Sequence, residues 1–121
     1  MSLSPEQLRL RTKDFAIRIV RHFRALPRVE EARIIGRQVL RSGTSVAANY
    51  RAVGRARSKA EFIARIGTVV EEADETVFWL ELLVDTGIVR EVRLRELRAE
   101  ANELLAIFAA SQRTVKTRMA R

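Results

Sequence analysis

The sequence contains no cysteine, and this absence excludes several kinds of chemistry. Disulfide bonds, thiolate catalysis and metal sites with cysteine ligands are all ruled out. No apolar run approaches the roughly 20 residues that a membrane-spanning helix needs. We therefore expect a soluble protein in a reducing compartment, the cytoplasm, with no membrane partner.

Residues that interrupt regular structure are also scarce. The 121 residues include only two prolines and five glycines, and no segment alternates apolar and polar residues with the period of a strand. Apolar residues instead recur at spacings of three and four, which is the pattern of helices that bury one face. The sequence predicts an all-α protein with a single domain, residues 1–121, folded as an antiparallel up-and-down four-helix bundle.

The ends of the predicted helices follow from short local signals. Two capping boxes, two prolines and one glycine mark them: Ser4 with Gln7, Pro5, Pro27, Ser58 with Glu61, and Gly87. We predict helices over residues 5–26, 29–54, 58–86 and 91–113, followed by a basic, mobile C-terminal tail at 114–121.

The second predicted helix is unusual because small residues form its apolar face. Between Ile35 and Gly54, serine, glycine, threonine and asparagine stand where alanine, leucine or glutamate would favour a helix more strongly. A neighbouring backbone can approach such a face closely. We predict that this helix is the central packing element, with structural or interface roles for Ser42, Gly43, Asn49 and Tyr50.

Three side chains lie where they suggest specific contacts. Asn49 falls on the apolar face, where a buried amide needs hydrogen-bond partners. We expect it to bond to a neighbouring helix and to fix the register between the two. Phe78 and Trp79 lie beside the apolar seam of the third helix, which fits either the edge of the core or a subunit interface, and we favour the interface.

Candidate catalytic and metal-binding groups lack the partners that they need. His22 is the only histidine, and no glutamate stands three residues before it, as the di-iron bundle motif requires. The carboxylates of residues 71–85 are better explained as a solvated or ion-paired face. No activating base is placed to serve Ser42, Thr44 or Ser45. We assign no catalytic residue, no metal and no cofactor, and we expect that the protein is not an enzyme.

Positive charge is concentrated in the first half of the chain. The net charge is +8, and residues 1–57 contain 13 basic and 4 acidic residues, whereas residues 58–88 contain 2 and 7. On the second helix and the connector after it, aligned basic residues form a candidate phosphate-binding stripe: Arg37, Arg41, Arg51, Arg55, Arg57 and Lys59. An equally weighted alternative pairs this stripe with the acidic face of the third helix in another subunit.

Parts of the second and third helices carry a resemblance to a known family. The residues concerned are Gln38, Ser42, residues 45–50, residues 55–62 and residues 71–83, which include Trp79-Leu80-Glu81-Leu82-Leu83. In them the chain resembles the four-helix-bundle family named for proteins encoded in 23S rRNA intervening sequences. That family is similar to the accessory variability protein of diversity-generating retroelements, a barrel-shaped homopentamer that binds nucleic acid and a reverse transcriptase.

The residues and the resemblance together predict a function without catalysis. We expect a homo-oligomer, a pentamer by the resemblance, that binds RNA or DNA phosphates through its arginine-rich surface. A nucleic-acid enzyme such as a reverse transcriptase is a further partner that the resemblance implies. The alternative is a structural or protein-interaction module with no nucleic-acid role, in which basic and acidic faces pair between subunits.

Overall fold

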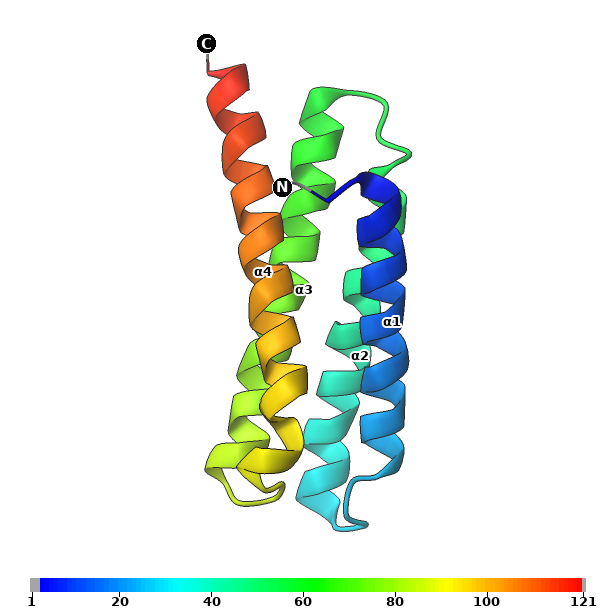
Figure 1. The fold of residues 1–121 in the computed structure, drawn as a ribbon, viewed down its shortest axis with the longest axis vertical. Helices are drawn as coiled ribbons and strands as arrows, with labels where there is room; N and C mark the ends of the chain where they lie inside the picture. The colour runs from blue at the N-terminus through cyan, green and yellow to red at the C-terminus, as the bar shows by residue number, and fades with distance from the viewer. Residues whose placement is uncertain (1–2, 121) are drawn as a thin grey trace.

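The computed structural model describes residues 3–120, which fold into four helices joined by short connectors (Figure 1). The helices are α1 (Pro5–Arg24), α2 (Glu30–Val53), α3 (Lys59–Asp85) and α4 (Glu91–Met119). Consecutive helices run in opposite directions, and the predicted all-α four-helix bundle is confirmed. Residues 1–2 and 121 of the predicted domain lie outside the described residues.

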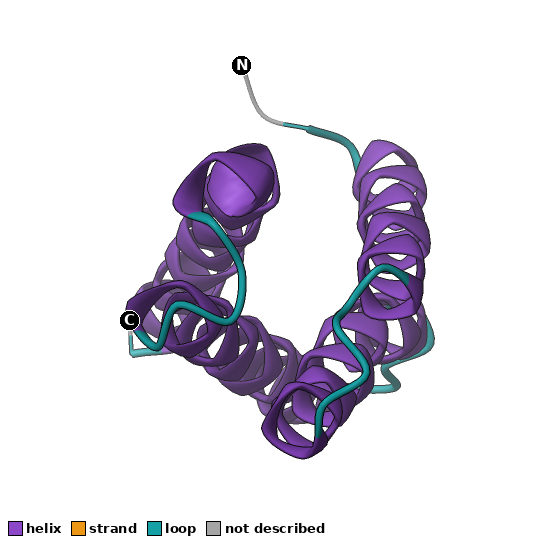
Figure 2. Ribbon diagram, turned by 90° about the horizontal axis from the view of Figure 1, so that it is seen from below, coloured by secondary structure: helices purple, strands orange, loops and turns teal. Residues whose placement is uncertain are grey.

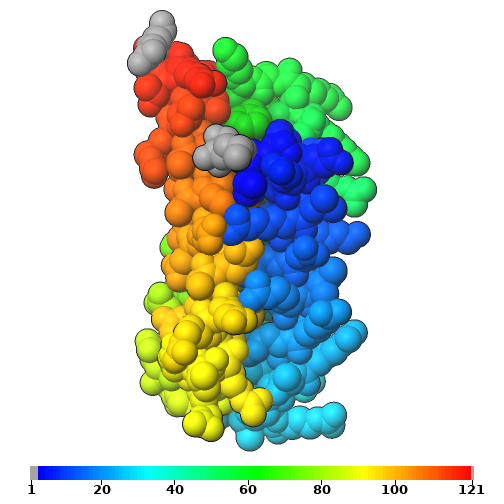
Figure 3. Space-filling model, in the orientation of Figure 1, coloured from blue at the N-terminus to red at the C-terminus, as the bar shows by residue number. Residues whose placement is uncertain are grey.

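The helices follow one another around the core in chain order (Figure 2). Each packs extensively on the next, whereas α1 and α4 touch each other far less. Arg11 joins these two helices through a bidentate ion pair with Glu100, at 2.9 and 2.7 Å, and a second ion pair with Glu103 at 2.9 Å. In the space-filling view, α1 and α4 lie side by side along this seam (Figure 3).

Local capping explains where α1 and α3 begin. Ser4 and Gln7 form the predicted capping box at the start of α1. Ser58 caps α3 by accepting a hydrogen bond from the backbone N–H of Glu61. The Glu61 carboxylate accepts from the backbone N–H of Arg57 and not from that of Ser58, so only half of the second predicted box forms. Burial does not contribute at either start, because these capping residues lie at exposed helix ends.

The C-terminal end of α4 differs from the prediction. The helix continues to Met119, so the predicted mobile tail is wrong for residues 114–119, and Arg121 lies outside the described residues. Residues 91–119 contain no proline or glycine, and nothing in them stops a helix. Val115 is half-buried and lines a hollow together with Phe62 of α3. The polar residues of this segment therefore indicate solvent exposure and not disorder.

The small face of α2 is buried, as predicted. Gly36, Ser42 and Gly43 are all inaccessible or nearly so, and α1 lies directly against the two glycines. A Cβ added at Gly43 would lie 2.8 Å from Cγ1 of Ile19, a fully buried residue of α1. The close approach of α1 to α2 thus requires glycine at position 43.

Gly43→Ala should destabilise the protein by about 1 to 3 kcal/mol, because the new methyl group overpacks the contact with Ile19. Gly67→Ala is the matched control, since its methyl would meet only Nε2 of the flexible Gln112 side chain, at 3.0 Å. Alanine favours a helix over glycine by about 1 kcal/mol, so this control should be neutral or stabilising. Urea unfolding measures both, and equal effects would contradict the role given to Gly43.

His22 is a partly buried histidine near the C-terminal end of α1. Its Nε2 atom is buried and has no hydrogen-bond partner among the described residues. It lines a hollow together with Leu26, Val89, Arg90 and Arg93. Burial lowers the pKa of His22 below the usual value for histidine.

Acidification should therefore destabilise the folded protein. The unfolded chain takes up a proton at His22 near pH 6.5, while the folded chain resists protonation until a lower pH. Stability is then lost as the pH falls from about 6.5 towards the folded pKa. His22→Leu should flatten this part of the profile between neutral and mildly acidic pH, as measured by urea unfolding. Parallel profiles for the two proteins would show that His22 does not contribute.

Candidate nucleic-acid interface

The predicted basic stripe is exposed along its whole length. Arg37, Arg41 and Arg51 lie on the outer face of α2, and Lys59 is the first residue of α3. Because α2 ends at Val53, Arg55 and Arg57 belong to the connector and not to the helix. The stripe thus continues from the side of the bundle to one of its ends.

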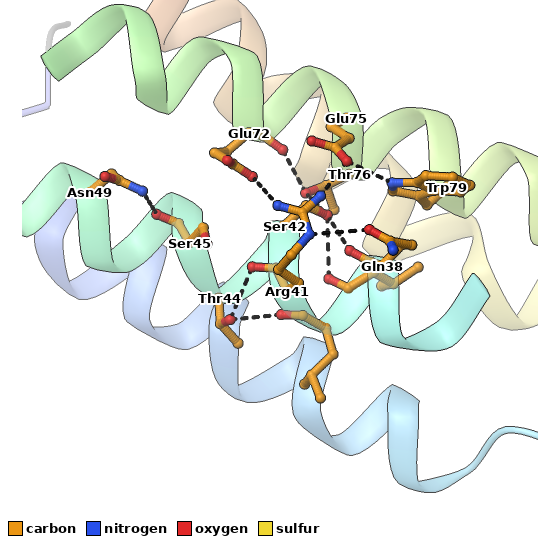
Figure 4. A network of polar contacts seen from close by, with 12 residues as sticks. Gln38, Arg41, Ser42, Thr44, Ser45, Asn49, Glu72, Glu75, Thr76 and Trp79 are labelled. Atoms are coloured by element: carbon orange, nitrogen blue, oxygen red, sulfur yellow. Dashed lines mark hydrogen bonds and ion pairs between the residues drawn. The ribbon is translucent and has the colours of Figure 1, made fainter. Parts of the chain in front are cut away.

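Arg41 differs from the rest of the stripe because its charge is already paired. Its guanidinium donates to Glu72 at 3.2 Å and to Glu75, both on α3 of the same chain (Figure 4). Glu75 also accepts from the indole N–H of Trp79 at 3.1 Å. The alternative to phosphate binding pairs the basic stripe with the acidic third helix of another subunit. For Arg41, this pairing occurs within one chain.

The other five predicted residues carry uncompensated charge. Within residues 3–120, four arginines have a carboxylate within 4.0 Å, namely Arg11, Arg41, Arg65 and Arg95. None of the remaining stripe residues is among them: Arg37, Arg51, Arg55, Arg57 and Lys59. Their positive charge is free to act on a ligand.

Two basic residues of α1 extend this surface, and sequence reasoning missed them. Arg9 and Lys13 line a hollow together with Ala47, Ala48 and Arg51 of α2. Their spacing of four places Arg9 and Lys13 on one side of α1. That signal was present in the sequence, but their proximity to Arg51 depends on how α1 packs on α2.

The unpredicted end of α4 adds charge at the connector. Arg118 lines one hollow together with Arg57 and Lys59, and the apolar side chains of Phe62 and Val115 line it as well. The first half of the chain and its last helix therefore meet in one basic region at this end of the bundle. The predicted mobile tail would not place Arg118 beside the connector, so the sequence did not predict this arrangement.

Beneath Arg41, a pair of buried hydroxyl groups links α2 to α3 (Figure 4). Thr76 lies 2.9 Å from Ser42, oxygen to oxygen, and both side chains are fully buried. Ser42 donates to the carbonyl of Gln38 at 2.7 Å, and Thr76 also lies 2.7 Å from the carbonyl of Glu72. The polar contact between helices that was assigned to Asn49 is made by Ser42.

The prediction for Asn49 is wrong. Its amide donates to the carbonyl of Ser45 on its own helix, at 2.9 Å, and the residue is only half-buried. A side chain that bonds within one helix cannot set the register between two.

A double-mutant cycle should detect coupling between Ser42 and Thr76. Ser42→Ala and Thr76→Val each remove one end of the contact, and we expect a coupling energy of about 1 kcal/mol. Ser42→Ala combined with Thr86→Val is the control cycle, because Thr86 is exposed and bonds only to carbonyls of its own helix. Urea unfolding gives both cycles, and additive effects in the first would show that the hydroxyl pair does not join the helices.

The three other structural candidates differ in burial. Tyr50 is buried with its ring centroid 5.0 Å from that of Phe108, and burial raises the pKa of its hydroxyl against the opposing charge of Arg9. Phe78 is 53% exposed and packs edge-to-face on the half-buried Trp79. Tyr50 is thus a core residue, while Phe78 places an aromatic ring on the surface.

The outer face of α3 carries the opposite charge to the stripe. Four of its carboxylates have no basic group within 4.0 Å in the described part of the chain: Glu71, Asp74, Glu81 and Asp85. No group of three or more potential ligands among residues 3–120 could hold a metal ion. Across the same residues, no helix is both long and apolar enough to cross a membrane.

The fold and this surface define a four-helix-bundle protein with separate basic and acidic faces. Residues 7–110 match the 23S rRNA-intervening sequence protein family, and the chain belongs to that family. The chain is also similar to a crystal structure of a protein of unknown function from the S23 ribosomal protein family of Bacteroides thetaiotaomicron. The two are 29% identical with a TM-score of 0.84, and the match covers 92% of this chain and 99% of that one. Comparison with curated proteins finds no match.

Proposed function

We propose that this protein is a noncatalytic, cytoplasmic homo-oligomer that binds RNA or DNA through its basic surface. The observation that carries the proposal is the set of exposed basic residues with no carboxylate within 4.0 Å, on α1, α2 and the connector. Phosphate groups are the ligands that such a surface attracts most strongly, through Coulomb attraction and counterion release.

The chemistry of the surface favours binding with little sequence selectivity. Arginine contacts to phosphates position a nucleic acid but do not read its bases. Tyr50 is buried and Trp79 is half-buried, so neither presents a freely exposed ring face for stacking on bases beside the basic stripe. The proposal therefore gives the backbone the main role in recognition.

Self-association forms the second part of the proposal. The exposed ring of Phe78 and the uncompensated acidic face of α3 are features that suit contact with another copy. The resemblance to the accessory variability protein suggests a pentamer, and a nucleic-acid enzyme such as a reverse transcriptase as a further partner. The alternative function is a structural or interaction module without nucleic acid, which the same acidic face also supports.

Removing two connector arginines should weaken nucleic-acid binding. We expect Arg55→Ala with Arg57→Ala to raise the Kd about tenfold at moderate salt, because a surface that engages fewer phosphates releases fewer counterions. The slope of log K against log salt should become shallower by about 1 for each phosphate that is no longer engaged. Fluorescence anisotropy with a duplex RNA and the matching DNA, across about 50 to 200 mM salt, gives both quantities.

The control variant carries the same change in charge at the other end of the bundle. Arg93→Ala with Arg95→Ala alters two exposed residues at the start of α4, one of them already paired with Glu91. Its affinity should remain close to that of the unaltered protein. Equal losses of affinity in the two double variants would indicate attraction to net charge alone, and no salt-dependent binding at all would refute the nucleic-acid proposal.

A further inference from the structure

The exposed ring of Phe78 lies at the centre of a regular acidic stripe. Along α3, the spacings of three and four place one aromatic and four acidic residues on a single face: Glu71, Asp74, Phe78, Glu81 and Asp85. In a chain with net charge +8, this face is exceptional, and its carboxylates have no basic group within 4.0 Å among residues 3–120. A partner for this face must bring both an apolar surface and positive charge.

The ring is also held in place by the network beneath it. Phe78 packs edge-to-face on Trp79, with ring centroids 4.9 Å apart. The indole N–H of Trp79 donates to Glu75, which is paired with Arg41 of α2 (Figure 4). An aromatic side chain that is fixed before contact loses less entropy on binding, which is typical of an interface anchor.

The same chain offers a surface with complementary properties. The hollow between α1 and α2 is lined by Leu10, with 62% of the residue exposed, and by the small side chains of Ala47 and Ala48. Three basic residues surround it, namely Arg9, Lys13 and Arg51, and Glu6 is the carboxylate of this lining. The hollow thus combines exposed apolar groups with a mostly positive rim.

We propose that Phe78 of one copy inserts into the α1–α2 hollow of the next copy. Lys13 and its basic neighbours then face the carboxylates that flank Phe78, and the ring covers Leu10. The inference rests on the self-association part of the proposed function and names the two surfaces that make the contact. Because these surfaces are different parts of the chain, the contact is heterologous, and repeated copies form a closed ring or an open filament.

This contact covers Arg9, Lys13 and Arg51 of the proposed basic surface and leaves its connector part accessible. The hollow uses the side of α1 and α2, whereas Arg55, Arg57 and Lys59 lie at the end of the bundle, beside the last turns of α4. Copies joined in this way would each present one such basic end.

Truncation of Phe78 is the first test. Sedimentation velocity on nuclease-treated protein, over a range of concentrations, measures association without nucleic acid. We expect Phe78→Ala to weaken association at least about tenfold, as for an interface anchor. Val92→Ala is the control, since Val92 is 58% exposed on α4 and lies outside both surfaces. Unchanged association of Phe78→Ala would overturn the inference.

Charge reversal tests the pairing of the two faces directly. Lys13→Glu makes the hollow more acidic and Asp74→Lys makes the α3 face more basic, so each change alone should weaken association at least about tenfold. A chain that carries both changes should recover association, because each reversed face again meets its opposite. Recovery is also expected when the two single variants are mixed.

The outcomes separate this inference from the proposed function. Circular dichroism melting verifies that each variant is folded. A double variant that associates no better than the single variants overturns the Phe78 contact, and so does a chain that stays monomeric at every concentration. A chain that stays monomeric also refutes the self-association part of the proposed function, whereas association that Phe78→Ala leaves unchanged overturns the contact alone. Neither result affects the nucleic-acid proposal, which depends on the connector variants.

Discussion

The contact between Ile19 and Gly43 fixes how closely α1 approaches α2, and other features of the structure depend on it. Because glycine has no Cβ, the branched side chain of Ile19 lies directly on the α2 backbone and is fully buried. Further along α2, Ala47 and Ala48 line the hollow between α1 and α2, together with basic residues from both helices. The small residues of α2 therefore have a packing role and also bring together charges that lie far apart in the sequence.

On its other side, α2 is held to α3 by polar contacts that extend from the core to the surface. Ser42 and Thr76 meet in the fully buried layer, and Arg41 pairs with Glu72 and Glu75 one step further out. Each buried hydroxyl is satisfied by a carbonyl of its own helix or by the other hydroxyl, so the pair carries no unpaired polar atom. This contact lies within the span of the acidic face of α3, two residues before Phe78.

The sequence was sufficient wherever the controlling physics is local. The capping residues Ser4 and Ser58 set helix starts through bonds to residues three positions away, and the helical period identified the buried faces. The sequence was insufficient at residues 114–119, where polarity alone suggested the end of a helix that in fact continues. It was also insufficient where a side chain has its hydrogen-bond partner on another helix. Asn49 and Ser42 have similar positions in the pattern of α2, and only the location of Thr76 distinguishes the residue that bonds across. The charges of α2 also depend on another helix. Arg41 meets Glu72 and Glu75 of α3, whereas Arg51 has no carboxylate within 4.0 Å among the described residues.

The division between paired and unpaired charge bears on how a basic chain could associate with itself. Two copies with net charge +8 repel each other at long range. At physiological salt the Debye length is about 8 Å, so this repulsion is screened, while close contacts between the α3 face and the α1–α2 hollow are screened much less. Bound phosphates would reduce the repulsion further. Under the two proposals, nucleic-acid binding at the connector and assembly therefore reinforce each other, and by linkage each must strengthen the other by the same factor. Nucleic acid on Arg9, Lys13 and Arg51 would instead compete with assembly.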